Sequence, residues 1–271
     1  MNYKLICSDI DGALLNKDRE LSESTIQEIK RLSHIPFVLI SSRMPKAIRH
    51  LQLQLGNASE PIIAYSGALI LKNEAVVQST VINNDVLEYI IDQCVNTSIH
   101  LSLFHADEWY VPSLDFWAFR EINNTKVEPI IKSNLEVLKT WKREEKGAHK
   151  IMCMGDEHDI DTLYKTLEKE QVDEITLYRS KSTYIEISHR SISKKTAIET
   201  LLHYNYQHIS LDEVIAFGDN YNDIEMLKAV GLGIAVGNAN DDVIKIAKRS
   251  TESNKNDGVA KALSELFQLS N

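Results

Sequence analysis

Two aspartates one residue apart, Asp9 and Asp11, are the first residues of the chain whose types and spacing could do chemistry. They follow the hydrophobic run Leu5–Cys7 and precede Gly12, which lets the chain turn sharply. Residues i and i+2 of an extended strand project to the same side, so both carboxylates are expected to leave the strand end together. Because neighbouring carboxylates repel, the pattern predicts a site for a hard divalent cation such as Mg²⁺. An acidic turn that simply ends a strand is the alternative.

Ser41 and Ser42 form a second candidate group, because they end the continuous apolar run Phe37–Ile40. Lys194 opens a segment with apolar residues at helical spacing, and a positive charge at a helix N-terminus opposes the helix dipole. Hydroxyl groups, backbone N–H groups and an ammonium are donors that can hold phosphate oxygens. Taken alone, the serines fit an ordinary strand-to-loop junction and Lys194 fits a solvated helix start.

A third group follows the apolar run Val214–Phe217, where Asp219, Asn222 and Asp223 lie within five residues of one another. By itself this stretch fits a turn that caps the next helix. Together with the other two groups it completes the set that phosphoryl transfer requires: a nucleophile, a metal clamp and donors for the phosphate oxygens. Asp219 would complete the metal shell with Asp223 beside it, and the Asn222 amide would hold a phosphate oxygen.

The remaining roles follow from the chemistry of each side chain. Asp9 is a plausible nucleophile, because a carboxylate can form an aspartyl-phosphate. Asp11 could protonate the leaving oxygen and then activate water. The Ser41 hydroxyl, the Ser42 backbone N–H and the Lys194 ammonium would hold the phosphate oxygens.

Strand-length apolar runs alternate with amphipathic helical segments at both ends of the chain. Strands are expected at residues 4–10, 37–40 and 61–65, and the same alternation resumes at Lys194. This pattern predicts an α/β fold with a doubly wound parallel sheet, which binds ligands outside the carboxyl ends of its strands. Each candidate group lies at such an end.

The pattern changes between residues 82 and 186, which we interpret as an α+β domain inserted into a core formed by 1–81 and 187–271. The charged stretch Trp141–Lys146 within the insert is expected to be a solvated face or a loop. Regular elements of the insert are expected at 85–95 and 159–169 (helices) and at 101–111, 150–154, 175–178 and 184–187 (strands).

No catalytic candidate lies inside the insert. We therefore expect it to be a cap that closes over the strand ends, excludes water and selects the substrate. Its strand-like stretches offer four candidate contacts with the leaving group: His105, Trp109, Arg179 and Tyr184.

Composition limits the function classes. The chain has 271 residues, of which 43% are hydrophobic and 25% charged, as is ordinary for a soluble globular protein. The net charge of −9 argues against non-specific binding to nucleic acid or anionic membranes, but a phosphate ester needs only local positive charge. Three scattered cysteines form no disulfide framework, and no apolar run approaches the roughly 18 residues of a membrane span. We expect a cytoplasmic monomer or weak homodimer.

Taken in order, these motifs resemble the haloacid dehalogenase (HAD) superfamily, specifically its Cof-like phosphatase branch with a large α/β cap. That resemblance implies a Rossmann-like core with an inserted cap. The matching segments are Asp9–Leu15, Leu39–Arg43, Ser193–Ala197, Gly218–Leu227, Gly237–Ala239, Thr251–Asn254 and Asp257–Ala260.

The resemblance also implies roles for individual residues. Asp9 would be the nucleophile and Asp11 the acid/base. Mg²⁺ would be bound by Asp9, the Asp11 backbone carbonyl and Asp219. Asp223 would support the metal shell or orient Lys194. The implied phosphate ligands are Ser41, Ser42, Lys194 and Asn222.

Two positions depart from the family pattern, and both bear on the rate and on the substrates tolerated: Ala13 stands where the family usually has Thr, and Ser42 replaces the usual Gly. The sequence predicts a magnesium-dependent phosphatase of small phosphorylated metabolites, such as sugar phosphates, acting through an aspartyl-phosphate. One alternative is a phosphosugar mutase of the same superfamily. Another is a non-catalytic phosphate-ligand sensor, against which the complete Asp9/Asp11 pair argues.

Overall fold

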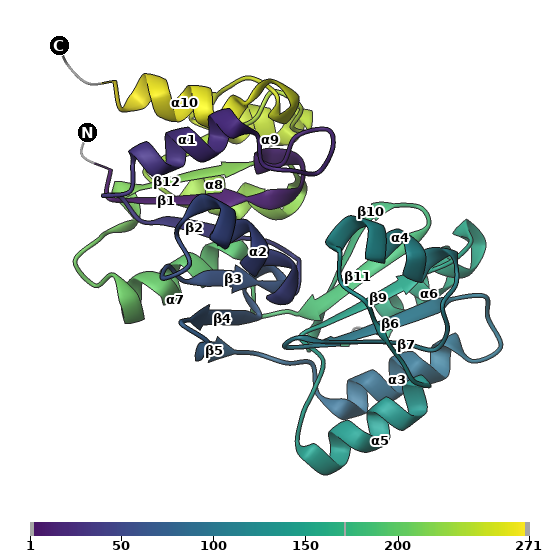
Figure 1. Ribbon diagram of the computed structural model, residues 1–271. Helices are drawn as coiled ribbons and strands as arrows, with labels where there is room; N and C mark the ends of the chain where they lie inside the picture. Colours follow the sequence, from purple (N-terminus) through teal and green to yellow (C-terminus); the bar gives the residue numbers. More distant parts are fainter. Residues whose placement is uncertain (1–2, 171, 269–271) are drawn as a thin grey trace. The chain divides into compact units, whose positions relative to one another are not determined.

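The computed structural model of the chain describes residues 3–170 and 172–268 and divides into two compact units (Figure 1). The first unit comprises Met1–Gln78 and Ser193–Asn271, and the second comprises Ser79–Ile192. The second unit is wider at both ends than the insert expected at 82–186.

Eight strands form the sheet of the first unit, in the order β14-β13-β12-β1-β2-β3-β4-β5. All pairings from β14 to β3 are parallel, whereas β4 runs antiparallel to β3. The parallel part confirms the predicted fold class, and the strands β4 and β5 were not predicted. The bounds are β1 Leu5–Asp9, β2 Phe37–Ile40, β3 Ile62–Ala64, β4 Leu69–Lys72, β5 Ala75–Ser79, β12 Val214–Gly218, β13 Leu232–Ala235 and β14 Arg249–Ser250.

Helices cover both faces of this sheet, as a doubly wound fold requires. In Figure 1, α1 and α10 lie together above β1 and β12, and α7 lies on the opposite side. Ser22 caps α1, since its side chain accepts a hydrogen bond from the Thr25 N–H at 3.1 Å. The bounds are α1 Glu23–Arg31, α2 Lys46–Leu55, α7 Lys194–Asn205, α8 Ile224–Ala229, α9 Asp241–Ile246 and α10 Gly258–Leu266.

The central strands β1, β2 and β12 are buried along their whole length, as expected for parallel strands covered on both faces. Their register pairs Ser8 with both Leu39 and Phe217. The three strands therefore end at the same edge of the sheet. Asp9 lies at this edge, and so do the residues that follow Ile40 and Gly218.

The second unit contains a six-stranded sheet in the order β10-β11-β9-β6-β7-β8. Pairings from β10 to β7 are antiparallel, and β8 runs parallel to β7. The strands are β6 His100–His105, β7 Glu108–Val111, β8 Ile130–Ile131, β9 Lys150–Met154, β10 Ile175–Lys181 and β11 Tyr184–His189, and the helices are α3 Asn84–Cys94, α4 Phe116–Thr125, α5 Asn134–Glu144 and α6 Glu157–Lys169.

The prediction of a solvated face or a loop at Trp141–Lys146 was wrong for Trp141 and correct for the exposed residues Lys142–Glu145. Trp141 lies on α5, is fully buried and belongs to the hydrophobic core of the second unit. Val137, Leu138 and Trp141 recur at helical spacing and face that core. The charged residues that follow Trp141 hid this amphipathic pattern, because they lie on the solvent side of the last turn.

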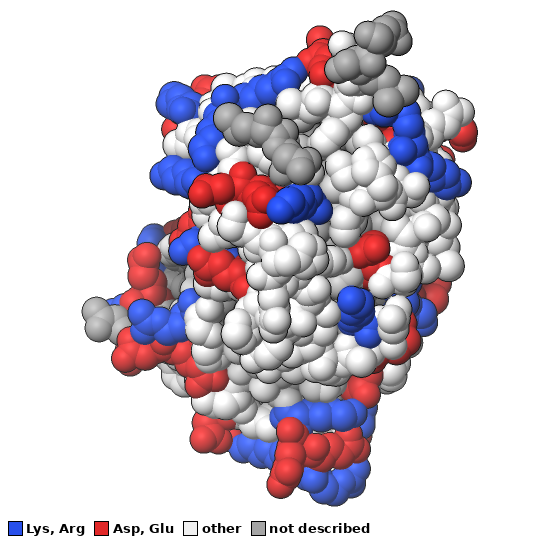
Figure 2. Space-filling view, turned by 90° about the vertical axis from the view of Figure 1, so that its left-hand side faces the viewer, with Lys and Arg blue, Asp and Glu red and all other residues white. Residues whose placement is uncertain are grey.

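Acidic and basic side chains are interspersed over the face of the molecule shown in Figure 2. Within residues 3–170 and 172–268, no helix is long and apolar enough to cross a membrane.

Candidate active site

Lys194 stands at the centre of the candidate site, between two carboxylates. Its Nζ donates to Asp9 Oδ1 at 2.5 Å and to Asp223 Oδ1 at 2.6 Å. All three side chains are almost entirely buried. Asp9 ends β1, Lys194 is the first residue of α7 and Asp223 precedes α8, so three separate segments meet at this point. The structure thus gives Lys194 a buried ion-pair role instead of a solvated helix start.

Asp219 is the third carboxylate of this cluster. Carboxylate oxygens of Asp9, Asp219 and Asp223 all lie within 4.8 Å of one another. Gly12, with φ of +86°, makes this approach feasible, because a Cβ at that position would collide with the Asp219 carboxylate. Asp219 Oδ1 is buried and accepts no hydrogen bond from any residue that the structure describes. A buried carboxylate oxygen without a donor is costly unless a cation supplies the missing interaction.

The cluster carries more negative than positive charge. When all groups are ionised, three carboxylates surround one ammonium, which leaves an excess of two negative charges. Burial raises the pKa of Asp9 well above its usual value although Lys194 opposes the shift. Burial and the neighbouring Asp223 raise the pKa of Asp219 to about 7. Burial alone would lower the pKa of Lys194, but Asp223 and Asp9 outweigh it and raise that pKa.

These observations fit a hard divalent ion. Carboxylate oxygens are the ligands that Mg²⁺ takes, and a charge of +2 would balance the excess of the cluster. Asp223 has its oxygens engaged already: Oδ1 accepts from Lys194, and Oδ2 accepts from the Asp219 and Asn220 N–H groups at 2.9 and 3.0 Å. Asp9 and Asp219 are therefore better placed than Asp223 to contact an ion directly.

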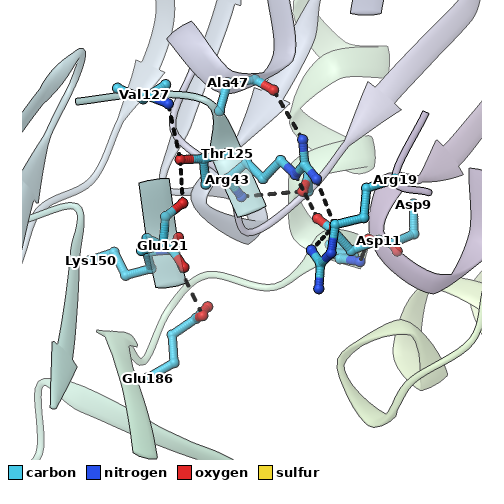
Figure 3. Close-up of polar contacts among 12 residues, drawn as sticks. Asp9, Asp11, Arg19, Arg43, Ala47, Glu121, Thr125, Val127, Lys150 and Glu186 are labelled. Carbon is cyan, nitrogen blue, oxygen red and sulfur yellow. Dashed lines mark hydrogen bonds and ion pairs between the residues drawn. The ribbon is translucent and has the colours of Figure 1, made fainter. Parts of the chain in front are cut away.

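Asp11 has a different partner from Asp9, contrary to the expectation that the two carboxylates project together. Strand β1 ends at Asp9, and Ile10–Leu14 forms a tight turn that redirects Asp11. Its Oδ2 accepts from Arg43 Nε at 2.6 Å and its Oδ1 from Arg43 Nη2 at 2.7 Å (Figure 3). Arg19 Nη1 approaches Oδ1 at 3.5 Å. This bidentate pairing orients the Asp11 carboxylate on one side of the candidate nucleophile.

The predicted phosphate ligands lie on the segments that leave the same sheet edge. Ser41 follows β2 and is buried, and its Oγ accepts a hydrogen bond from the Arg43 N–H at 3.2 Å. Ser42 is half-buried beside it. Asn222 is half-buried on the short 3₁₀ helix Tyr221–Asp223 that follows β12. The structure thus brings the candidates from three strand ends to one edge.

Two contributors escaped the sequence analysis. Arg43 appeared there only as part of a motif, although a lone arginine directly after a strand-end serine pair is the type of signal that could have identified it. Gly67, with φ of +116°, is the second. A Cβ there would lie 2.8 Å from Ala197 Cβ and 2.9 Å from the Ser193 carbonyl oxygen. Glycine thus allows the turn after β3 to pack against the start of α7, which carries Lys194.

The four candidate contacts in the second unit have distinct environments. Trp109 is buried and donates to Ser102 Oγ, and His105 Nδ1 is 2.7 Å from the Gly147 carbonyl oxygen. Arg179 pairs with Asp161 at 2.7 Å. Tyr184 is half-buried on β11, where its ring lies beside the Arg120 guanidinium. All four remain predicted contacts with the leaving group.

Comparison with known proteins gives a consistent family. A model described as haloacid dehalogenase-like hydrolase matches residues 6–263. A Haemophilus influenzae protein named putative phosphatase is 33% identical over 98% of this chain and 99% of its own length. A Bacillus subtilis protein named 5-amino-6-(5-phospho-D-ribitylamino)uracil phosphatase is 28% identical over 98% of each chain.

Comparison of the fold with solved structures indicates the same family. The crystal structure of a haloacid dehalogenase-like hydrolase from Bacteroides thetaiotaomicron has a TM-score of 0.88 and 27% identity, and the alignment covers 98% of this chain and all of that one. The chain therefore belongs to the haloacid dehalogenase-like hydrolase family and is a phosphatase.

Proposed function

We propose that this enzyme is a magnesium-dependent phosphatase of small phosphorylated metabolites, such as sugar phosphates, and that it acts through an aspartyl-phosphate intermediate. The observation that carries the proposal is the cluster of the buried Asp9 and Asp223 and the half-buried Asp219, in which a single ammonium pairs with Asp9 and Asp223. Its excess negative charge and the unpartnered Asp219 oxygen call for a cation, and Asp9 provides a nucleophile beside it.

In the first step, an Asp9 carboxylate oxygen attacks phosphorus. A bond forms between Asp9 and the phosphoryl group while the bond from phosphorus to the ester oxygen breaks. The leaving oxygen takes a proton from Asp11. Donors on Ser41, Ser42, Lys194 and Asn222 hold the phosphate oxygens throughout and stabilise their charge.

In the second step, Asp11 accepts a proton from a water molecule, which attacks the aspartyl-phosphate and releases inorganic phosphate. The structure holds Asp11 as an acceptor of two hydrogen bonds from Arg43. A proton donor needs an O–H, so the first step requires Asp11 to turn one oxygen away from Arg43. Arg43 would then orient the carboxylate again for its role as a base.

Asp9, Asp219 and the Asp11 backbone carbonyl would hold Mg²⁺, with Asp223 supporting them through Lys194 and the Asp219 N–H. When bound, the ion neutralises charge on the phosphate oxygens and on the carboxylates. We also propose that residues 82–186 act as a cap that selects the substrate. The Bacillus subtilis relative, whose name specifies a phosphorylated ribitylamino-uracil, supports small phosphorylated metabolites as the substrate class.

A phosphate-release screen tests the proposal. The protein is assayed on a panel of phosphorylated metabolites with Mg²⁺ and with excess chelator, beside Asp9→Asn. We expect magnesium-dependent release of inorganic phosphate by the wild type alone. A mutase would instead return isomerised sugar phosphate without free phosphate, and a phosphate sensor would bind panel members without turnover.

A further inference from the structure

The sheet of the second unit has two different faces. On β6, Leu101 and Leu103 belong to the hydrophobic core shared with α3, α5 and α6. Side chains alternate along a strand, so His100, Ser102 and Phe104 point to the opposite face. That second face carries buried polar groups, which require internal partners.

A chain of hydrogen bonds ties this second face to the start of α4. Trp109 Nε1 donates to Ser102 Oγ at 3.1 Å, and Ser102 Oγ lies 3.0 Å from His100 Nε2. His100 Nδ1 lies 2.7 Å from Asp115 Oδ2. Although the order Ser–His–Asp occurs in hydrolase triads, Ser102 is fully buried, so this chain acts as a structural tether.

The tether fixes α4 because Asp115 is also the helix cap. Asp115 Oδ1 accepts from the backbone N–H groups of Trp117 and Ala118 at 2.9 and 3.0 Å. The first turn of α4 is therefore anchored to the sheet. Side chains on the next turn are presented from a rigid support, as a preorganised binding residue requires.

Arg120 lies on that turn, close to two aromatic rings. Its guanidinium carbon is 5.6 Å from the centroid of the Trp117 ring and 5.8 Å from that of the Tyr184 ring. The side chain is half-buried. Phe116, one turn earlier on the same side of the helix, is 70% exposed and adds an apolar surface next to it.

Arg120 differs from the other arginines of the second unit. Arg143, Arg179 and Arg190 each pair with a carboxylate at 2.7 to 3.5 Å. Among residues 3–170 and 172–268, none accepts a hydrogen bond from Arg120 or forms an ion pair with it. The aromatic rings hold the guanidinium by cation–π contacts but leave its planar N–H donors available, and these donors match a carboxylate or phosphate.

We propose that Arg120 is an anion-binding residue that recognises a carboxylate or phosphate group on a small organic ligand. The anion has two sources: a second anionic group of the phosphorylated substrate, or a separate anionic metabolite. The first source rests on the proposed phosphatase function, and the second does not. Phe116 would pack against the organic part of the ligand.

The first experiment compares two esters that differ in charge but hardly in shape, 4-carboxyphenyl phosphate and 4-carbamoylphenyl phosphate. KM and kcat are measured with Mg²⁺ for the wild type, Arg120→Gln and the control Arg143→Gln, which removes an exposed arginine of the same unit. For a substrate-borne anion, Arg120→Gln raises KM for the carboxylate ester roughly tenfold and leaves KM for the amide unchanged. Arg143→Gln changes neither value, and Arg120→Lys restores part of the loss.

The second experiment measures binding of benzoate to the same full-length proteins by calorimetry, without a phosphate ester. For a separate ligand, benzoate binds the wild type and Arg143→Gln but not Arg120→Gln, while the two esters show no difference between variants. Equal behaviour of Arg120→Gln and Arg143→Gln in both experiments overturns the proposal. If the wild type hydrolyses neither ester nor any metabolite of the panel, the phosphatase function fails, and loss or retention of benzoate binding in Arg120→Gln still decides the role of Arg120.

Discussion

The two units bury their polar groups in opposite ways. In the first unit, Asp9, Asp219 and Asp223 surround Lys194 and leave negative charge in excess. In the second unit, His149 Nδ1 accepts a hydrogen bond from the Ala106 N–H, and Ser79 Oγ lies 2.9 Å from His149 Nε2. Burial lowers the pKa of His149 to about 3. That ring is therefore neutral and satisfied within the protein.

This difference teaches where a ligand is needed. A buried cluster that is not balanced by its own side chains is stable only when something else supplies the missing charge. The carboxylate cluster of the first unit meets this description, whereas the buried histidines of the second unit do not. Arg120 is the exception in the second unit, because no described carboxylate balances its charge, although its side chain is only half-buried.

The largest expected effect is that of Asp9→Asn. The variant should lose turnover, because an amide is a far weaker nucleophile than a carboxylate. In metal-free buffer it should also melt at a higher temperature than the wild type, since one of the repelling carboxylates is gone. Phosphate release and thermal unfolding in chelator measure both effects, with the exposed Asp18→Asn as control. Near-normal phosphate release would refute the covalent mechanism.

The second-largest loss of activity is expected for Asp11→Asn. Removing a general acid/base lowers kcat by roughly 10²–10⁴-fold, while the fold persists because Asp11 is outside the buried cluster. Steady-state kinetics on the best substrate of the panel and circular dichroism provide the test. A rate within a few-fold of the wild type would show that another group moves the proton.

Asp219→Asn tests the cation requirement of the unbalanced cluster. We expect the Mg²⁺ concentration for half-maximal activity to rise by more than about tenfold, because a carboxylate oxygen of the cluster is lost. Calcium should inhibit the wild type, since its larger and looser shell would misplace the nucleophile. Titration of activity with each ion gives the answer, and full activity of the wild type in excess chelator would contradict the metal site.

A smaller effect, roughly tenfold in kcat, is expected for Arg43→Lys. Lysine keeps the charge but cannot make the bidentate contact that orients Asp11. The matched control is Arg49→Lys, because Arg49 makes the same kind of bidentate contact with the exposed Glu74. KM should stay unchanged in both variants. If the two variants have the same kcat, Arg43 has no role in positioning Asp11.

The smallest effect concerns the stability of the second unit at acid pH. The pKa of His149 is lowered from its usual 6.5 to about 3 on folding, so protonation of the unfolded chain destabilises the fold as the pH falls below 6.5. The free energy of unfolding should drop by about 1 kcal/mol between pH 6.5 and 5.5 from this group alone. His149→Gln should remove that part of the slope.

Tryptophan fluorescence during urea unfolding measures this prediction selectively, because Trp109, Trp117 and Trp141 all lie in the second unit. The control is His158→Gln, which alters an exposed histidine of the same unit and should leave the pH slope unchanged. If His149→Gln also leaves the pH dependence of the free energy of unfolding unchanged, His149 has the same pKa in the folded and unfolded states.

The sequence by itself determined the parallel core and the strand ends at which the candidate residues lie. Apolar runs such as Phe37–Ile40 and Val214–Phe217 identify buried strands from local pattern alone. Parallel strands that are adjacent in a sheet must end at the same edge, so Asp9, Ser41 and Asp219 could be placed together before any contact was known.

Only the tertiary structure decided the partners of those residues. Arg43 takes both oxygens of Asp11, and Lys194 joins Asp9 to Asp223, through contacts between segments far apart in the chain. The pairing of Arg120 with Tyr184 arose in the same way. Local periodicity describes which face of an element is apolar, but the direction of a charged side chain depends on the distant group that offsets its burial. For that physical reason the sequence predicted the place of the site and left its geometry to the fold.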